Sequence, residues 1–242
     1  MTEEVAGLAE HLDEVTGALE ALTATFDSDP DLGVILQAVC DQVIKVIPGA
    51  DMASITLVRD GVPQTVASTD RRAVEIDSAQ YTQGDGPCLR AAATGQIVRV
   101  EVGTAKELWP HFAEASLAVG VGSYLAAPLT VDAALSGAMN LFGYGTHGFR
   151  ETEAKLLDLY TTVVVFGLRA TRRYQSARGE VAQLRTALVS RSVIDQAKGI
   201  LMAVHTLTAE QAFQALVTRS QNENEKLHIV AARIVEQAST GF

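Results

Sequence analysis

A run of apolar residues at helical spacing, uninterrupted by proline, most constrains the fold of this chain. It begins near residue 151 and continues to about residue 188, and Gly167 and Gly179 are its two glycines. Steps of three and four place the apolar side chains on one face of a helix. We therefore expect one long helix that serves either as a signalling connection or as a passive dimerising spacer. The seam of its second half consists of Ala170, Tyr174, Ala177, Val181, Leu184 and Leu188.

Residues 191–242 have the pattern of three short helices. Thr208 and Gln211 fit a capping box, which predicts that the second helix begins near Ala209. Asn224 is a candidate N-cap for the third helix. Helices of this length bury little apolar area alone, so they need one another. The positions expected to face their shared core are Ile194, Ala197, Leu201 and Val204 in the first helix and Leu227, Val230, Ala231, Ile234 and Ala238 in the third.

The motif of this segment is a ten-residue run followed by scattered positions in register. It comprises Val193–Met202, Thr208, Glu210–Phe213, Leu216, Ser220-Gln221, Asn224, Lys226-Leu227 and Val230-Ala231. On these residues the segment resembles the ANTAR domain, an RNA-binding module of bacterial transcription antiterminators. The resemblance implies that paired hairpin loops of a nascent transcript are bound so that a terminator does not form. The candidate residues for RNA contact in this segment are Arg191, Gln196, Lys198, Gly199, Arg219, Ser220, Asn224 and Lys226.

Each of these residues also has a purely structural interpretation. Asp195 and Lys198 are three apart on one helix face and form a plausible surface ion pair. As an RNA contact, Lys198 would meet a phosphate and Gln196 a base edge in a loop. Arg219 suits the negative end of a helix dipole equally well.

Three positions depart from the family pattern. Ala203-Val204 stand where Glu-Arg is frequent, and Val217 stands where Arg is frequent. An Arg that is frequent before the Val-Ala of the third helix appears as His228, two residues before Val230. Fewer or displaced cations imply weaker RNA affinity or a different RNA partner.

The distribution of charge agrees with an RNA contact at the C-terminal end. The whole chain has a formal net charge of −10. Residues 1–170 hold 10 Lys and Arg against 23 Asp and Glu, whereas residues 171–242 hold 9 against 6, a balance of +3. Contact with a polyanion requires local rather than overall positive charge.

Residues 30–170 alternate between helical and strand patterns. We expect strands near 52–58, 63–68, 97–102, 124–131 and 137–143, helices near 32–46 and 106–118, and, between the second and third strands, an irregular segment that leads into a further helix. Asp60-Gly61 predicts a tight hairpin turn. This order indicates an α+β fold around an antiparallel sheet.

Short motifs are spread over these strands and loops. They are Ser54–Gly61, Thr65–Asp70, Gln80-Tyr81, Gly84–Leu89, Trp109–Phe112, Gly122-Ser123, Ala127–Leu129 and Gly137–Leu141. On these residues the segment resembles a GAF domain, a small-molecule sensor fold. The resemblance makes a small-molecule ligand one expectation, although no motif identifies the ligand or a cofactor. Candidate ligand or redox residues are Tyr81, Cys88, Trp109 and Met139, each of which also suits core packing.

Cys88 has a specific reason to be considered. It follows Gly84–Pro87 on a loop that leads into an expected helix, and a helix N-terminus lowers the pKa of a thiol. Redox sensing and a small apolar residue in a turn are the two interpretations. Cys40, between Val39 and Val43, suits a structural role.

Residues 3–26 form the pattern of one further helix. Its apolar positions, which step alternately by three and four, are Val5, Leu8, Leu12, Val15, Leu19, Leu22 and Phe26. We expect either a seam against another helix, in a coiled-coil dimer or within the protein, or an amphipathic helix packed on its own domain. The domain plan is a helix at 1–26, a GAF-like domain at 30–170, a helical linker at 171–190 and an ANTAR-like module at 191–242.

Several classes of protein are disfavoured by what the sequence lacks. It contains no membrane-span pattern, no signal peptide and no Cys-x-x-Cys, which favours a reducing cytoplasm. It lacks nucleophile-elbow, P-loop and zinc-protease motifs, so we expect neither an enzyme nor a metal site. The sequence therefore favours a dimeric cytoplasmic sensor-regulator that binds RNA. The alternatives are a ligand or redox sensor acting through protein partners, a DNA-binding regulator and, last, an enzyme that uses the GAF-like pocket.

Overall fold

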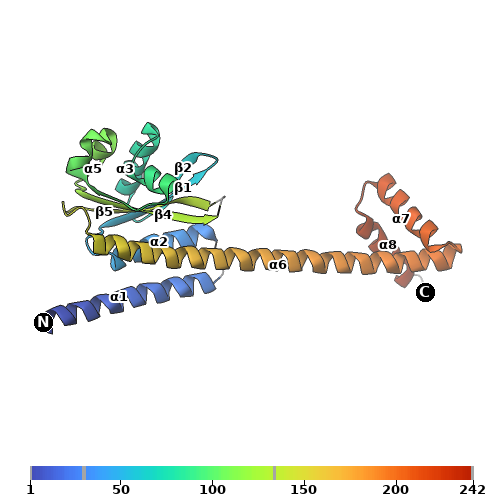
Figure 1. Ribbon diagram of the computed structural model, residues 1–242. Coiled ribbons are helices and arrows are strands. Elements are labelled where there is room, and N and C mark those ends of the chain that lie inside the picture. Colours follow the sequence, from blue (N-terminus) through green and yellow to red (C-terminus); the bar gives the residue numbers. More distant parts are fainter. Residues whose placement is uncertain (1, 29–30, 133–134, 241–242) are drawn as a thin grey trace. The chain divides into compact units, whose positions relative to one another are not determined.

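The computed structural model describes the backbone of residues 2–28, 31–132 and 135–240 (Figure 1). The chain falls into two compact units, which we call the N-terminal unit (residues 1–172) and the C-terminal unit (residues 173–242). The long helix expected from the apolar run is confirmed. Helix α6 runs over Glu151–His205 and contributes to both units.

A five-stranded antiparallel sheet forms the centre of the N-terminal unit, in the order β2-β1-β5-β4-β3. The turn between the first two strands has φ 52° at Asp60 and 77° at Gly61, which is the geometry of the expected two-residue hairpin. The α+β class is therefore confirmed. The strands are β1 (Met52–Arg59), β2 (Val62–Ser68), β3 (Val98–Glu101), β4 (Ser123–Asp132) and β5 (Leu135–Gly143).

Helices cover both faces of this sheet (Figure 1). Because side chains alternate along a strand, Ile55 and Leu141 join a core with α2 and α6. Phe142 and Tyr124 join a second core on the opposite face, with α3, α4 and α5. The helical elements of this unit, apart from α6, are α1 (Thr2–Asp27), α2 (Leu32–Val46), α3 (Arg71–Gln83), α4 (Pro87–Thr94), the 3-10 turn η1 (Val102–Glu107) and α5 (Pro110–Ala118).

Helix α3 was not expected, because the sequence of residues 71–83 lacks a clear apolar stripe. The side chain of Asp70 accepts a hydrogen bond from the backbone N–H of Arg72 and so caps the start of the helix. Gly84, with φ 71°, ends it. Half of its buried face is polar, since Asp77 and Gln80 are buried beside Ala73 and Ile76. The prediction of an irregular segment was therefore wrong.

The described side chains of α1 pack on their own unit. Ala18 and Leu22 are buried in the core that α2 and α6 share, whereas Leu12 is 55% exposed. Gly167 of α6 lies so close to this helix that a Cβ atom there would be 2.5 Å from the Phe26 ring. From Val15 onward, the seam is thus one within the protein. Val5 and Leu8 lie outside the described side chains.

The C-terminal unit packs the end of α6 against α7 (Ala209–Glu223) and α8 (Leu227–Thr240). The expected capping box is confirmed, since Thr208 and Gln211 exchange side-chain to backbone hydrogen bonds of 2.9 and 3.2 Å. Most of the expected apolar face is also confirmed. Val204 is an exception, at 68% exposed, because it lies in the last turn of α6. The core consists of Ala197, Leu216, Val230, Ala231 and Ile234.

Asn224 does not cap the third helix. It has φ 50° and ends α7, with its N–H donating to the carbonyls of Ser220 and Gln221. The third helix begins three residues later, at Leu227. Asn is favoured at both kinds of helix end, because its short polar side chain suits an N-cap and also tolerates the left-handed conformation.

Candidate functional site

A hydrogen-bonded polar cluster lies in the interior of the N-terminal unit, between the sheet and α3. It is organised around Asp77, whose Oδ2 accepts from Ser54 Oγ at 2.7 Å and from Thr65 Oγ1 at 2.9 Å. Tyr81, one helical turn later, has its hydroxyl 2.8 Å from the hydroxyls of both Thr56 and Thr65. We call this group the polar cluster: Ser54, Thr56, Thr65, Asp77, Tyr81 and Asn140.

Asn140 of β5 completes the polar cluster from the centre of the sheet. Its Nδ2 donates to Thr56 Oγ1 at 2.9 Å and to Ser54 Oγ at 3.1 Å, and lies 3.4 Å from Asp77 Oδ1. Its Oδ1 is buried without a hydrogen-bond partner. A buried acceptor without a donor costs free energy and marks a place where a change of protonation or a ligand would gain a bond.

The electrostatics of the polar cluster are set by burial. Burial raises the pKa of Asp77 to about 7, although hydrogen bonds from Ser54, Thr65 and Asn140 oppose the shift. Burial likewise raises the pKa of the Tyr81 hydroxyl far above its usual value, with the Asp77 charge as a second cause. Asp77 is therefore the group of this pair that changes charge near neutral pH.

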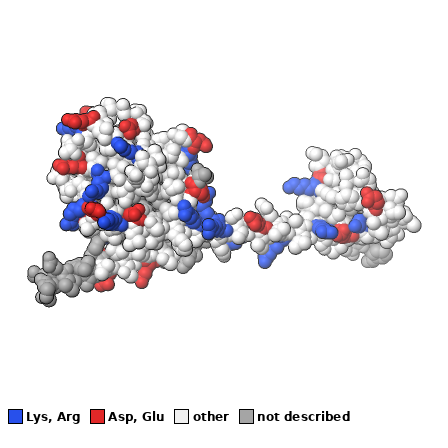
Figure 2. Space-filling view, in the orientation of Figure 1, with Lys and Arg blue, Asp and Glu red and all other residues white. Residues whose placement is uncertain are grey.

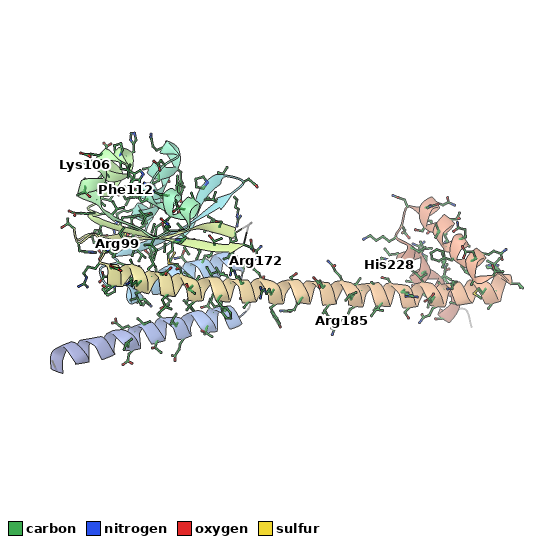
Figure 3. All side chains as sticks on the ribbon, viewed as in Figure 1. Arg99, Lys106, Phe112, Arg172, Arg185 and His228 are labelled. Atoms are coloured by element: carbon green, nitrogen blue, oxygen red, sulfur yellow. The ribbon has the colours of Figure 1, made fainter. Side chains whose placement is uncertain are left out.

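The four residues predicted for ligand or redox sensing do not form one site. Tyr81 belongs to the polar cluster, and Cys88 is fully buried in the same core, on α4. Trp109 lies beside α5, where its ring packs edge-on to Phe112 at a centroid distance of 6.5 Å (Figure 3). Met139 belongs to the core on the opposite face of the sheet, so it does not share a site with the other three.

Cys88 does not have the lowered pKa that its position before a helix suggested. Burial raises the pKa of this thiol well above its ordinary value, and the nearby Asp77 adds to the shift. The cause is that an apolar interior opposes formation of the thiolate more strongly than an eight-residue helix favours it. The reactivity argument for this thiol was therefore wrong.

The polar cluster was missed in the sequence because its members are far apart in the chain. Asp77 and Asn140 are 63 positions apart. A partial signal existed, since Ser54 and Thr56 interrupt one face of the apolar strand β1 while Asp77 and Tyr81 are one helical turn apart.

In the C-terminal unit, the predicted RNA residues fall into separate groups. The first is an ion-pair group on α6, in which the Asp195 carboxylate lies 3.1 Å from Lys198 Nζ and 3.9 Å from Arg191 Nε. These three side chains and Met202 share one flank of the helix, beside the face that contacts α7 and α8. Lys198 keeps 29% of its side chain exposed and Arg191 keeps 83%.

Gln196 lies elsewhere on α6. Residues two positions apart in a helix are separated by about 200°, which puts Gln196 roughly 160° from Lys198 around the axis. The buried Ala197 lies between them in the sequence. Gly199 lies one turn after Asp195, on the same side of the helix as that carboxylate. A Cβ atom on Gly199 would meet nothing within 4 Å, so packing within the chain does not require a glycine there.

Arg219 belongs to an ion-pair network that joins α7 to α8. It donates to Glu223 at 2.7 Å, and Glu223 also accepts from Arg233 at 2.7 Å. Arg233 donates in addition to Glu225. Ser220 donates to the backbone carbonyl of Glu225, and Lys226 is exposed. On the face shown in Figure 2, Lys and Arg of this unit lie beside Asp and Glu.

Within the described residues, no His, Cys, Asp or Glu group of three or more is arranged to hold a metal ion. No described helix is long and apolar enough to cross a lipid bilayer.

Comparison with known proteins identifies both units. Residues 29–169 match the GAF domain, and residues 182–235 match the ANTAR domain. These matches define the class of the chain as a regulatory one, with a sensory fold followed by a helical output module. The chain belongs to the GAF domain family and carries an ANTAR domain near its C-terminal end. No curated protein matches it.

Solved structures support the fold of the first unit. The phycoerythrobilin-bound GAF domain of a cyanobacterial phytochrome is 16% identical, with a TM-score of 0.50 over 66% of this chain and 97% of that one. The GAF domain of a phosphoenolpyruvate-protein phosphotransferase from Coxiella burnetii is 16% identical, with a TM-score of 0.50 over 69% and 98%. A bacteriophytochrome from R. palustris is 13% identical, with a TM-score of 0.55 over 86% and 46%.

Proposed function

We propose that this protein is a signal-responsive regulator whose ANTAR domain binds hairpin loops of nascent RNA in the cytoplasm and thereby causes transcription antitermination. The GAF domain supplies the sensory input. The observation that carries the proposal is the match of residues 182–235 to the ANTAR domain, combined with cationic side chains on a flank of α6 outside the three-helix core.

The flank formed by Arg191 and Lys198 suits a phosphate backbone. Both cations share Asp195, and exposed ion pairs contribute little in water, so an RNA phosphate can replace the carboxylate at small cost. Phosphate contacts position the protein, and unpaired loop bases supply specificity. Gln196, roughly 160° from Lys198 around the axis, would meet a loop base only if RNA wraps around α6, whereas Gly199 lies one turn after Asp195 on the side of the cations.

A second copy of the chain, paired along α6, would let two ANTAR domains act together. Tyr174, Leu184 and Leu188 are 60–66% exposed along the seam of α6, although large apolar side chains are normally buried. A seam at heptad spacing fits a parallel pair of helices. Two ANTAR domains held in this way would bind two hairpins of one transcript, with the second binding event made intramolecular.

The polar cluster is our candidate for the sensory input. It contains the unpartnered Oδ1 of Asn140 and the ionisable Asp77 within one hydrogen-bonded group. A small molecule with a hydrogen-bond donor, or a proton, would find an acceptor there.

A second function has one specific observation in its favour. Arg219 is engaged by Glu223, and the chain lacks several of the cations frequent in ANTAR domains. Both facts suit a ligand-sensing regulator whose ANTAR domain contacts a protein instead of RNA.

Binding of full-length protein to a labelled RNA with two short tandem hairpins tests the proposal. A linear RNA of equal length and a DNA duplex serve as comparison ligands, across a range of salt. Removal of one phosphate contact by Lys198→Ala should weaken hairpin binding about fivefold and reduce the salt slope by about one. The matched control is Lys45→Ala, an exposed lysine on α2. Equal affinity for all three nucleic acids, or none at low salt, contradicts the proposal.

A further inference from the structure

Two arginines fasten α6 to the hairpin between β4 and β5. Arg169 donates from Nε to the Val131 carbonyl at 2.7 Å and from Nη2 to the Thr130 carbonyl at 3.2 Å. One turn later, Arg172 forms an ion pair with Asp132 at the end of the same strand (Figure 3). We call this group the exit clamp: Thr130, Val131, Asp132, Arg169 and Arg172.

The strand offers these carbonyls because its hydrogen bonding is incomplete at this point. The β4–β5 register shifts between Thr130 and Asp132, and a residue at such a bulge is left without a strand partner. On the outer side, β3 pairs with β4 only over Ser123–Ala126. A guanidinium that donates to free carbonyls forms charge-assisted hydrogen bonds, which are stronger than neutral ones.

Asp132 joins the start of β5 to α6. Its Oδ1 accepts from the backbone N–H of Leu135 at 3.0 Å, while its Oδ2 accepts from Arg172. One carboxylate therefore contacts both the first residue of β5 and the helix. A shift of the hairpin relative to α6 has to break or move these bonds.

The exit clamp connects strand β4 of the GAF domain to α6. One member of the polar cluster, Asn140, lies on β5, where it pairs with Ala126 of β4. The boundary between the two units falls directly after Arg172. The β4–β5 register is continuous from Ser123 to Thr130, so we expect a shift of β5 at Asn140 to reach β4 as far as Thr130 of the clamp.

We propose that the exit clamp is the coupling element of this protein: it converts a change in the polar cluster into a change in α6 beyond Arg172. The proposal adds a coupling route to the proposed function, and its test uses no RNA. A failure of RNA binding therefore leaves the result of this test unaffected.

Hydrogen–deuterium exchange of full-length protein measures the coupling. Asp77→Asn serves as the perturbation, because it keeps the shape of the side chain and removes its charge. In an otherwise unchanged protein, this substitution should alter the exchange rate of amides in residues 173–188 about threefold or more. In a protein that also carries Arg169→Ala and Arg172→Ala, Asp77→Asn should alter the exchange rate of these amides less than about 1.5-fold.

Two further variants keep the test decisive. Asp132→Asn retains an acceptor for Leu135 and removes only the charge that Arg172 needs, so it decides the question if the double arginine variant does not fold. Arg173→Ala, at the next and exposed position of α6, is the matched control and should leave the Asp77→Asn effect intact. The proposal is overturned if Asp77→Asn does not change exchange in residues 173–188. It is also overturned if the effect persists without the clamp, or if Arg173→Ala abolishes it.

Discussion

Ser54 donates a 2.7 Å hydrogen bond to Asp77, and both side chains are completely buried. The bond links the middle of strand β1 to helix α3. It places an ionisable group in the interior of the GAF domain, on the face of the sheet opposite α6. We therefore expect the stability of this domain to depend on the protonation of this carboxyl group.

The first prediction concerns pH. The pKa of Asp77 is about 7 in the folded protein, against an ordinary value of 3.8. Because folding raises this pKa, the folded state retains a proton that the unfolded chain has lost between these values. The stabilisation is fully present below about pH 4 and is lost as the pH rises through about 7, a change on the order of 4 kcal/mol.

Chemical denaturation between about pH 4 and pH 8 measures this change. The free energy of unfolding should fall with rising pH in the natural protein and vary much less in Asp77→Asn. The exposed Asp41→Asn on α2 is the control and should follow the natural protein. A parallel pH dependence in Asp77→Asn would show that this carboxyl is not the titrating group.

The second prediction concerns the core of the ANTAR domain. Leu216 is fully buried between α6, α7 and α8. Replacing it with alanine should cost about 2–5 kcal/mol, which is a large share of the stability of so small a unit. Calorimetry should show a lower transition for the ANTAR domain with the GAF transition unmoved. The exposed neighbour Ala215→Ser should shift neither transition.

The third prediction separates an RNA contact from a structural ion pair at Arg219. Glu223 pairs with both Arg219 and Arg233, so Glu223→Gln removes a negative charge and releases Arg219, while Arg233 keeps its ion pair with Glu225. Affinity for a tandem-hairpin RNA should rise about threefold at low salt and converge on the natural value at high salt. Unchanged affinity at low salt would mean that Arg219 lies outside the RNA interface.

The fourth prediction concerns the seam of α6. Leu184→Glu should convert a dimer into a monomer in sedimentation experiments, because it puts a charge into an apolar seam. Thr186→Glu, two positions away on the exposed surface of the helix, is the matched control and should remain dimeric. A dimer that survives Leu184→Glu would place the interface elsewhere.

Local signals in the sequence predicted much of this fold. The hairpin at Asp60-Gly61, the cap at Thr208 and the apolar spacing of α6 each depend on residues close together in the chain. Helix α3 and the polar cluster were missed because they depend on contacts such as Asp77 with Asn140, which only the folded sheet creates. Cys88 shows the same limitation, since its position before α4 was visible but its burial was not.

Terminator readthrough would show whether the ANTAR domain acts on a nascent transcript. A single-round transcription assay would use a template that encodes two tandem hairpins before a terminator. Added full-length protein should raise readthrough several-fold, Lys198→Ala should abolish most of the gain, and Lys45→Ala should retain it. Readthrough that stays unchanged at protein concentrations that saturate the hairpin RNA would contradict the account.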